Sequence, residues 1–539
     1  MANGPRHPLV ILAFDKYQFM DAPQPCGWTT FSMLIHALRK ISPLPIFSLF
    51  VSTTGKIRPP APKITPHHGD CVFDPPPPLQ PITEIVFDDL AFPALENTVS
   101  LDRVTQADWM SHLGRPLCVH FHFTYFFSNN LFSTLGRFGA YWDALAGDDS
   151  EKELLRFAKQ KLLNGKPILV DGDRPGSLAC LAVRFALKFN SDAISGGIVC
   201  TQVEHHMQLI LAATTGFETL VTITGSEPLL AEAASQLTHE SRAIPVHNLV
   251  HNVDLDCIDH GRRGDLVAAL LIMQARDAAA LVSKNGRWMS VSDFLQALLP
   301  QSAYETLQRS LPTFWRKGEG TSFTETFKDY AMWFDHVIRV EDDEMINSEF
   351  LWMFITRGAM IMCPHNQYGV DIVLPACLMK GSPSRDTVTA VLIRVKNIEY
   401  PGHHIDETSF DLMDPFMGLF SDEQEPRPVI RMVLGLGSTV PGVLFPAARE
   451  HDPLTSSQFT SFDIWCSGLS EDTYKGVGDD LASYQLLLRR LRRSQYAFNL
   501  DDSETNVGHD PDARNTREFA RERMLPLTGC GPGHNAIHA

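Results

Sequence analysis

The chain has 539 residues, of which 44% are apolar, so it is long enough to form several globular domains with cores of their own. Its net charge of −17, from 46 basic and 63 acidic residues, disfavours a non-specific nucleic-acid binder, because phosphate contacts depend on lysine and arginine. The ten cysteines form no Cys-x-x-Cys pair and no apolar stretch reaches membrane-spanning length, so we expect an intracellular protein without a membrane partner.

Residues 1–115 are predicted to form an α/β unit. The run at 9–14 is continuously apolar, as buried parallel strands are, 46–56 is predicted to be a second buried strand, and 29–41 between them has helical spacing. Residues 58–81 contain two proline clusters and are predicted to be a linker.

The two apolar runs of this unit are similar to the Walker B and sensor strands of P-loop ATPases. The first ends at Asp15, the position of the magnesium-binding aspartate, and the second continues into residues 52–54, Ser-Thr-Thr. Lys16 stands where those enzymes carry a catalytic acid, and the sequence contains no GxxxxGK[ST] loop to hold phosphate. We therefore expect neither ATP binding nor ATP hydrolysis.

Residues 116–150 are predicted to be an irregular aromatic insert and a linker. The segment 117–142 is rich in phenylalanine but has neither the period of a strand nor that of a helix. Leu-Gly-Arg occurs at both 113–115 and 135–137. Two interpretations stay open, a buried aromatic loop and a retained intron covering about residues 117–137.

Residues 151–330 are predicted to be a helical domain. Residues 151–163, EKELLRFAKQKLL, are amphipathic and rich in good helix formers. The segments LACLAVRFALKF, HHMQLILAATT, EPLLAEAASQLT and GDLVAALLIMQARDAAAL continue the helical pattern, with short polar links between them.

Residues 331–493 change to a mixed pattern, and 494–539 are predicted to be a disordered tail. The predicted order is helix, three strands, a short helix and further strands, with a closing helix; the segments are 345–357, 359–363, 369–375, 387–396, 427–437, 462–468 and 479–493. The basic run LRRLRRS is either a nuclear import signal or the solvated face of the closing helix, so cytoplasmic and nuclear locations both stay open.

Asp371 and the pair Arg394 and Lys396 are the candidate catalytic residues. Asp371 follows a glycine turn and opens one strand, and alternation along the next strand places Arg394 and Lys396 on one face. This is the layout of the PD-(D/E)xK nuclease core, where two carboxylates hold Mg²⁺ and the lysine assists attack on a phosphodiester. Glu349 on the preceding predicted helix would be the upstream acid and the second metal ligand, with Glu344 as the alternative.

Arg394 is the departure from that layout. It occupies the position of the second acid, and a permanently protonated guanidinium cannot ligate a cation. The same residue that completes the pattern thus argues against Mg²⁺ binding and against cleavage.

With these segments assembled, the chain resembles an uncharacterised family of mushroom-forming fungi that is related to Crinkler-type NTPase–nuclease proteins. The resemblance covers about residues 8–116 and 139–470, and is carried by PLVILAFDKYQF, PIFSLFVSTTGKI, ELLRFAKQKLL, TGSEPLLAEAA, RGDLVAALLIMQARD, FITRGAMIMCPHNQYGVDIVLP and VLIRVKN. It implies a P-loop NTPase remnant whose phosphate loop would lie upstream of Met1, a helical middle and a restriction-endonuclease-like end.

Three functional hypotheses follow from the resemblance and its departures. The first is an inactive or weakly active nuclease-like protein that retains contact with nucleic acid; any remaining activity would be that of a magnesium-dependent phosphodiesterase. The second is a non-catalytic protein-interaction module built on the helical middle, and the third is a decayed gene product. The sequence alone does not separate them.

Overall fold

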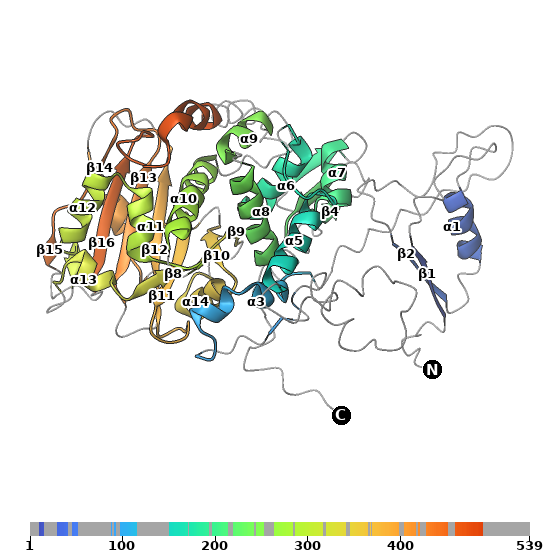
Figure 1. Ribbon diagram of the computed structural model, residues 1–539, viewed down its shortest axis with the longest axis horizontal. Helices are drawn as coiled ribbons and strands as arrows, with labels where there is room; N and C mark the ends of the chain where they lie inside the picture. The colour runs from blue at the N-terminus through green and yellow to red at the C-terminus, as the bar shows by residue number, and fades with distance from the viewer. Residues whose placement is uncertain are drawn as a thin grey trace, which may run out of the picture. The chain divides into compact units, whose positions relative to one another are not determined.

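The computed structural model describes residues 10–15, 30–40, 46–51, 88, 91–92, 97–115, 150–170, 172–192, 197–213, 219–241, 244–252, 263–283, 286–315, 320–340, 345–364, 367, 369–397, 404–416, 419–420, 427–450 and 459–488 (Figure 1). The predicted aromatic insert, Lys16, Glu344 and the predicted tail lie outside these residues. The described part mixes helices with several sheets, as expected of an α/β plus α protein.

The chain forms two compact units, and the first combines residues 1–83 with residues 189–223. Its amino-terminal part has the predicted α/β pattern: β1 (Val10–Asp15) and β2 (Ile46–Val51) pair in parallel and are joined through α1 (Thr30–Lys40). Asp15 closes β1, opposite Val51.

The second part of this unit corrects the helical prediction for residues 205–215. It contains an antiparallel sheet in the order β3 (Phe189–Asp192), β5 (Thr219–Ile223) and β4 (Leu209–Ala213), with α7 (Gly197–His205). The run Leu209–Ala213 is only five residues long. A continuous apolar run of that length does not distinguish a strand from a buried helix by its periodicity.

The second unit combines residues 84–188 with residues 224–539, and its helices account for most of the predicted helical middle. The described helices before the large sheet are α2 (Leu101–Val104), α3 (Ala107–Ser111), α5 (Ser150–Leu162), α6 (Arg174–Phe185), α8 (Pro228–Glu240), α9 (Pro245–Asn252), α10 (Arg263–Val282), α11 (Val291–Leu298), α12 (Gln301–Arg309) and α13 (Phe323–Phe327). Helix α8 packs against both α5 and α6. None of the described helices is long and apolar enough to cross a membrane.

The large sheet of this unit has the order β15-β7-β16-β13-β12-β11-β10-β9. Its strands are β6 (Met289–Ser290), β7 (Phe314–Trp315), β8 (Tyr330–Met332), β9 (His336–Arg339), β10 (Ala359–Met362), β11 (Ile372–Leu378), β12 (Val388–Lys396), β13 (Val429–Gly435), β14 (Gly442–Leu444), β15 (Arg449–Glu450) and β16 (Ser461–Ser467). The short strands β6 and β7 come from the stretch predicted as helical, so the sheet and the helical middle are joined and not separated at residue 330.

The predicted order of helix and strands is found in α14 (Ser348–Thr356), β10, β11, β12, α15 (Thr408–Asp411) and β13. Strands β10, β11 and β12 pair antiparallel, whereas β12, β13 and β16 run parallel, so their carboxyl ends meet at one edge. Because β12 is central, its residues up to Ile393 are buried on both sides, which explains its nearly continuous apolar sequence.

Helices cover both faces of the sheet, as Figure 1 shows for α10 over β12. A Cβ added to Gly264 at the start of α10 would come 2.9 Å from Val395 Cγ1, so odd-numbered residues at the end of β12 face α10. The opposite face packs with α14 in a core that includes Leu351, Phe354 and Leu392.

Candidate functional site

Asp371 lies beside the end of β12, where the sequence predicts it. Its backbone N–H donates to the Ile393 carbonyl (2.9 Å), and its Oδ2 accepts from the Val395 N–H (2.7 Å). Gly369 makes this turn, because its φ is +80° and an added Cβ would come 1.8 Å from the Leu412 carbonyl oxygen. The structure thus brings Asp371 to the segment 394–396, but one of its carboxylate oxygens is already hydrogen-bonded to the backbone N–H of Val395.

Lys396 is held by a carboxylate that the sequence analysis did not identify. Its Nζ lies 2.5 Å from Asp406 Oδ2 and 5.7 Å from the centre of the Trp465 ring. Thr408 and Ser409 also donate to Asp406, over 2.5 and 2.8 Å. The hydrogen bond from Lys396, and then that from Thr408, hold the pKa of Asp406 well below its usual value against the opposing effect of burial. The lysine is therefore neutralised locally and fixed in place.

Arg394 lies on the same face of β12 as Lys396 and is partly buried. Its Nη1 is buried and has no hydrogen-bond partner among the residues that the structure describes. A buried guanidinium N–H without an acceptor costs free energy, and because this atom is buried an external acceptor does not reach it in this conformation.

Glu349 does not join Asp371, which corrects the predicted convergence. Its carboxylate lies 3.8 Å from the guanidinium of Arg385, and the two side chains are 60% and 51% exposed. Arg385 belongs to the turn between β11 and β12, whereas Asp371 precedes β11, and the seven residues of that strand span about 23 Å. The sequence pattern could not reveal this, because the crossing of α14 over the sheet depends on packing.

The residues at this site do not fit the Mg²⁺ that the resemblance implies. The predicted second ligand lies at the far end of the hairpin, and a guanidinium stands beside the first. Among the described residues, no group of three or more His, Cys, Asp and Glu side chains is arranged to hold a metal ion.

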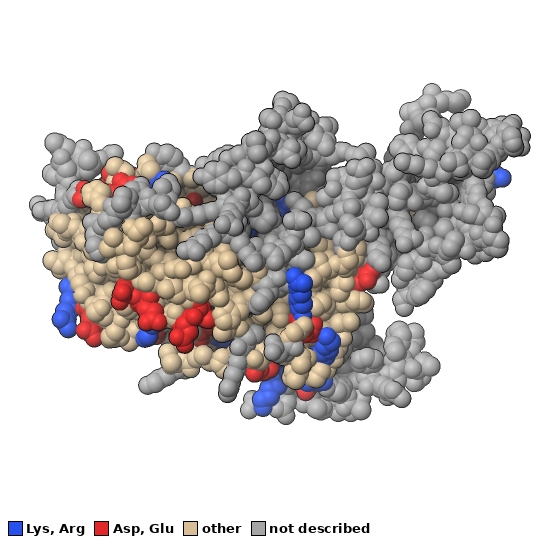
Figure 2. All heavy atoms as spheres, turned by 90° about the horizontal axis from the view of Figure 1, so that it is seen from above, with Lys and Arg blue, Asp and Glu red and all other residues tan. Residues whose placement is uncertain are grey.

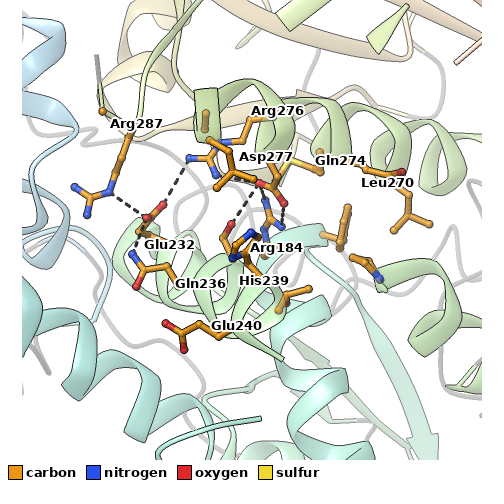
Figure 3. Close-up of a pocket in the computed structure, with 18 residues that line it drawn as sticks. Arg184, Glu232, Gln236, His239, Glu240, Leu270, Gln274, Arg276, Asp277 and Arg287 are labelled. Atoms are coloured by element: carbon orange, nitrogen blue, oxygen red, sulfur yellow. Dashed lines mark hydrogen bonds and ion pairs between the residues drawn. The ribbon is translucent and has the colours of Figure 1, made fainter. Parts of the chain in front are cut away.

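A second polar cluster lies in the helical part and was missed by the sequence analysis (Figure 3). Arg184 on α6 forms two hydrogen bonds with Asp277 on α10, of 2.7 and 2.8 Å, and Arg276 Nη1 donates to the same carboxylate over 3.0 Å. Glu232 on α8 lies 3.6 Å from Arg276 and 3.1 Å from Arg287. The sequence contained a signal for buried charges: Arg276 and Asp277 interrupt one long apolar helical segment, and Arg184 interrupts another.

The carboxylates of this cluster are ionised. Burial opposes the charge on Asp277, but Arg184 and then Arg276 outweigh it, so the pKa of Asp277 is lowered. The pKa of Glu232 is lowered in the same way, with Arg276 and Arg287 outweighing burial. The cluster is therefore a set of charged pairs at ordinary pH.

A third cluster contains the residue types of a serine hydrolase. Ser226 Oγ lies 2.7 Å from His336 Nε2, and His336 Nδ1 lies 2.6 Å from Asp335 Oδ1. The three residues are only 5%, 1% and 0% exposed, and the Ser226 hydroxyl also accepts from Arg357 Nε over 2.9 Å. Because a nucleophile must reach its substrate, we interpret this relay as a hydrogen-bond network of the core.

Comparison with known proteins finds a family model that matches part of the chain. Residues 176–411 match a family described as "Domain of unknown function (DUF8736)". No curated protein matches the chain, and no solved structure does. The matched stretch begins in α6 and ends in α15, so it contains both the cluster around Asp277 and the end of β12.

Proposed function

We propose that this protein is a nuclease-like binding protein that does not cleave nucleic acid, and that its helical part, the helices of the second unit within residues 151–330, is the working surface. The observation that carries the proposal is the closure of the predicted catalytic cluster. Asp371 Oδ2 accepts from the Val395 N–H, and Lys396 Nζ is paired with Asp406, so the groups expected to hold a metal and assist attack are bonded within the protein.

Electrostatics at the end of β12 supports the same proposal. At about 4 Å and an effective dielectric near 20, a unit of repelled charge costs roughly 4 kcal/mol, and a divalent ion beside Arg394 doubles that cost before solvent relaxes. A carboxylate at the same position would instead attract the ion. The guanidinium thus works against the chemistry that the fold resemblance suggests.

The helical part provides the contrasting feature, an open cavity. Side chains of α8 and α10, with the end of α6, line a space of about 530 Å³ next to the paired charges. Cavities of about 300–1,000 Å³ are typical of small-molecule sites. The helical region thus offers room for a ligand.

The test is a cleavage assay of the full chain with single- and double-stranded DNA and RNA, in Mg²⁺ and in Mn²⁺. We expect no cleavage above that of an Asp371→Ala variant prepared in parallel. Metal-dependent cleavage by the unmodified chain that Asp371→Ala abolishes would overturn the proposal.

A second candidate function, contact with a nucleic-acid phosphate, is favoured by the partly exposed side chain of Arg394, whose guanidinium suits a phosphate. On the face shown in Figure 2, the coloured basic side chains stand among acidic ones and form no broad patch within the described residues. On this face, binding would therefore rest on single contacts. Filter binding of labelled oligonucleotides to Arg394→Gln, with Arg385→Gln as the matched control, decides it: only the first should weaken binding, and equal effects would exclude this contact.

A further inference from the structure

The cavity in the helical part has one polar and one apolar side (Figure 3). Leu270, Gln274, Asp277 and Leu281 of α10 all line it, and their spacing of three or four residues places them on one face of the helix. Phe185 and Met273 add to the apolar side. A ligand that fills the cavity meets both kinds of surface.

The charges at the polar side are balanced. The guanidinium groups of Arg184, Arg276 and Arg287 face the carboxylates of Asp277 and Glu232, and Arg287 also pairs with Glu151 over 2.5 Å. At the rim, Glu240 is paired with Lys159 over 2.6 Å. A charged ligand therefore gains no net attraction from the cluster, because the charges of its guanidinium groups and carboxylates sum to zero.

The spare hydrogen-bonding capacity of the cluster is that of an acceptor. The side chain of Asp277 is 30% exposed, whereas those of Arg184 and Arg276 are 3% exposed. Asp277 Oδ2 accepts one hydrogen bond, from Arg184, among the described residues, and a carboxylate oxygen has room for a second. At the polar side, Asp277 Oδ2 can therefore accept a hydrogen bond from a donor on a ligand.

We propose that this cavity binds an uncharged, amphipathic small molecule that donates a hydrogen bond from a hydroxyl or amide group to Asp277 and lays its apolar body against Leu270 and Leu281. The inference rests on the proposed function, since it gives the helical part its ligand class. The balanced charges give an ion no net attraction, the partly exposed carboxylate of Asp277 selects a donor, and the apolar stripe of α10 selects a hydrophobic body.

Four compounds with one apolar body test the proposal: naphthaleneethanol, naphthaleneacetate, naphthaleneethylamine and ethylnaphthalene. They present a neutral donor, an anion, a cation and no donor, and binding to the full chain is followed by naphthalene fluorescence. We expect saturable binding of naphthaleneethanol, at least tenfold tighter than that of the other three. No saturable binding of naphthaleneethanol, or equal binding of a charged analogue, overturns the proposal.

Two neighbouring substitutions locate the binding. Leu281 lines the cavity and is 65% exposed, so Leu281→Arg narrows the cavity with little cost to folding. Val282 is 76% exposed and does not line this cavity, so Val282→Arg is the matched control. We expect the first to weaken naphthaleneethanol binding at least tenfold and the second to leave it unchanged, with unaltered circular dichroism spectra for both.

The outcomes separate this inference from the function on which it rests. If Leu281→Arg and Val282→Arg bind naphthaleneethanol equally well, the cavity is not the site and the inference fails, while the absence of cleavage would stand. Metal-dependent cleavage of nucleic acid would overturn the proposed function whatever the naphthalene compounds do.

Discussion

Replacing Asp406 by Asn should loosen the end of β12 in a way that depends on pH. The carboxylate accepts from Lys396, Thr408 and Ser409, and a hydrogen bond to a charged group contributes about 1.5–3 kcal/mol. The side chains of Lys396 and Asp406 are 11% and 25% exposed, so solvent partly screens the pair. We therefore expect Asp406→Asn to lower the local stability by about 1.5 kcal/mol, the lower end of that range. Asn keeps the shape but removes the charge.

The sign of the pH dependence follows from the lowered pKa of Asp406. A carboxylate whose pKa is lower in the folded state stabilises fully above its unfolded value, about 3.9, and loses that contribution as the pH falls towards the folded value. The difference between wild type and Asp406→Asn should thus be constant from about pH 8 to 5 and shrink below about pH 4.

Amide hydrogen exchange of peptides covering residues 388–397 measures this local opening directly. Asp386→Asn is the control, because Asp386 is an exposed carboxylate at the other end of the hairpin. Unchanged exchange in Asp406→Asn at pH 7, or an equal difference at pH 3, would refute the reasoning. Cleavage should stay absent in this variant, because Arg394 is still present when Lys396 is released.

Three further substitutions test other parts of the structure. Arg394→Glu places a second carboxylate near Asp371, so Mg²⁺ at ten times its Kd should stabilise this variant by about 1.4 kcal/mol in thermal melts, and Arg385→Glu should show no such effect. Asp463→Asn removes the counter-ion of the buried Arg431 guanidinium, whose Nη2 lies 2.6 Å from Asp463 Oδ2 in the wild type. The free energy of unfolding, measured by chemical denaturation, should fall by about 3–5 kcal/mol, and a fall of less than about 1 kcal/mol would contradict a buried pair. Ser226→Ala removes the hydroxyl between His336 and Arg357, so the free energy of unfolding in urea should fall by about 1–3 kcal/mol. An unchanged midpoint of the urea unfolding curve would argue against the hydrogen-bond network of the core.

Local patterns in the sequence determined the elements around β12. Alternation along Val388–Lys396 placed Arg394 and Lys396 on one face, and the glycine turn placed Asp371 at the start of the neighbouring strand. These inferences hold because strand geometry and turn chemistry act over a few residues. The same local reasoning identified Arg394 as the residue that opposes a metal.

Only the tertiary structure decided which distant groups meet. Asp406, in a segment without periodicity, closes on Lys396, and Glu349 lies at the far end of the hairpin, because helix crossing and loop course depend on the packing of the whole core. Arg184 and Asp277 are 93 residues apart and pair across α6 and α10. Each looks like an ordinary charge in its own helix, and no local rule joins them, since the cost of a buried charge is offset only by a partner that folding supplies.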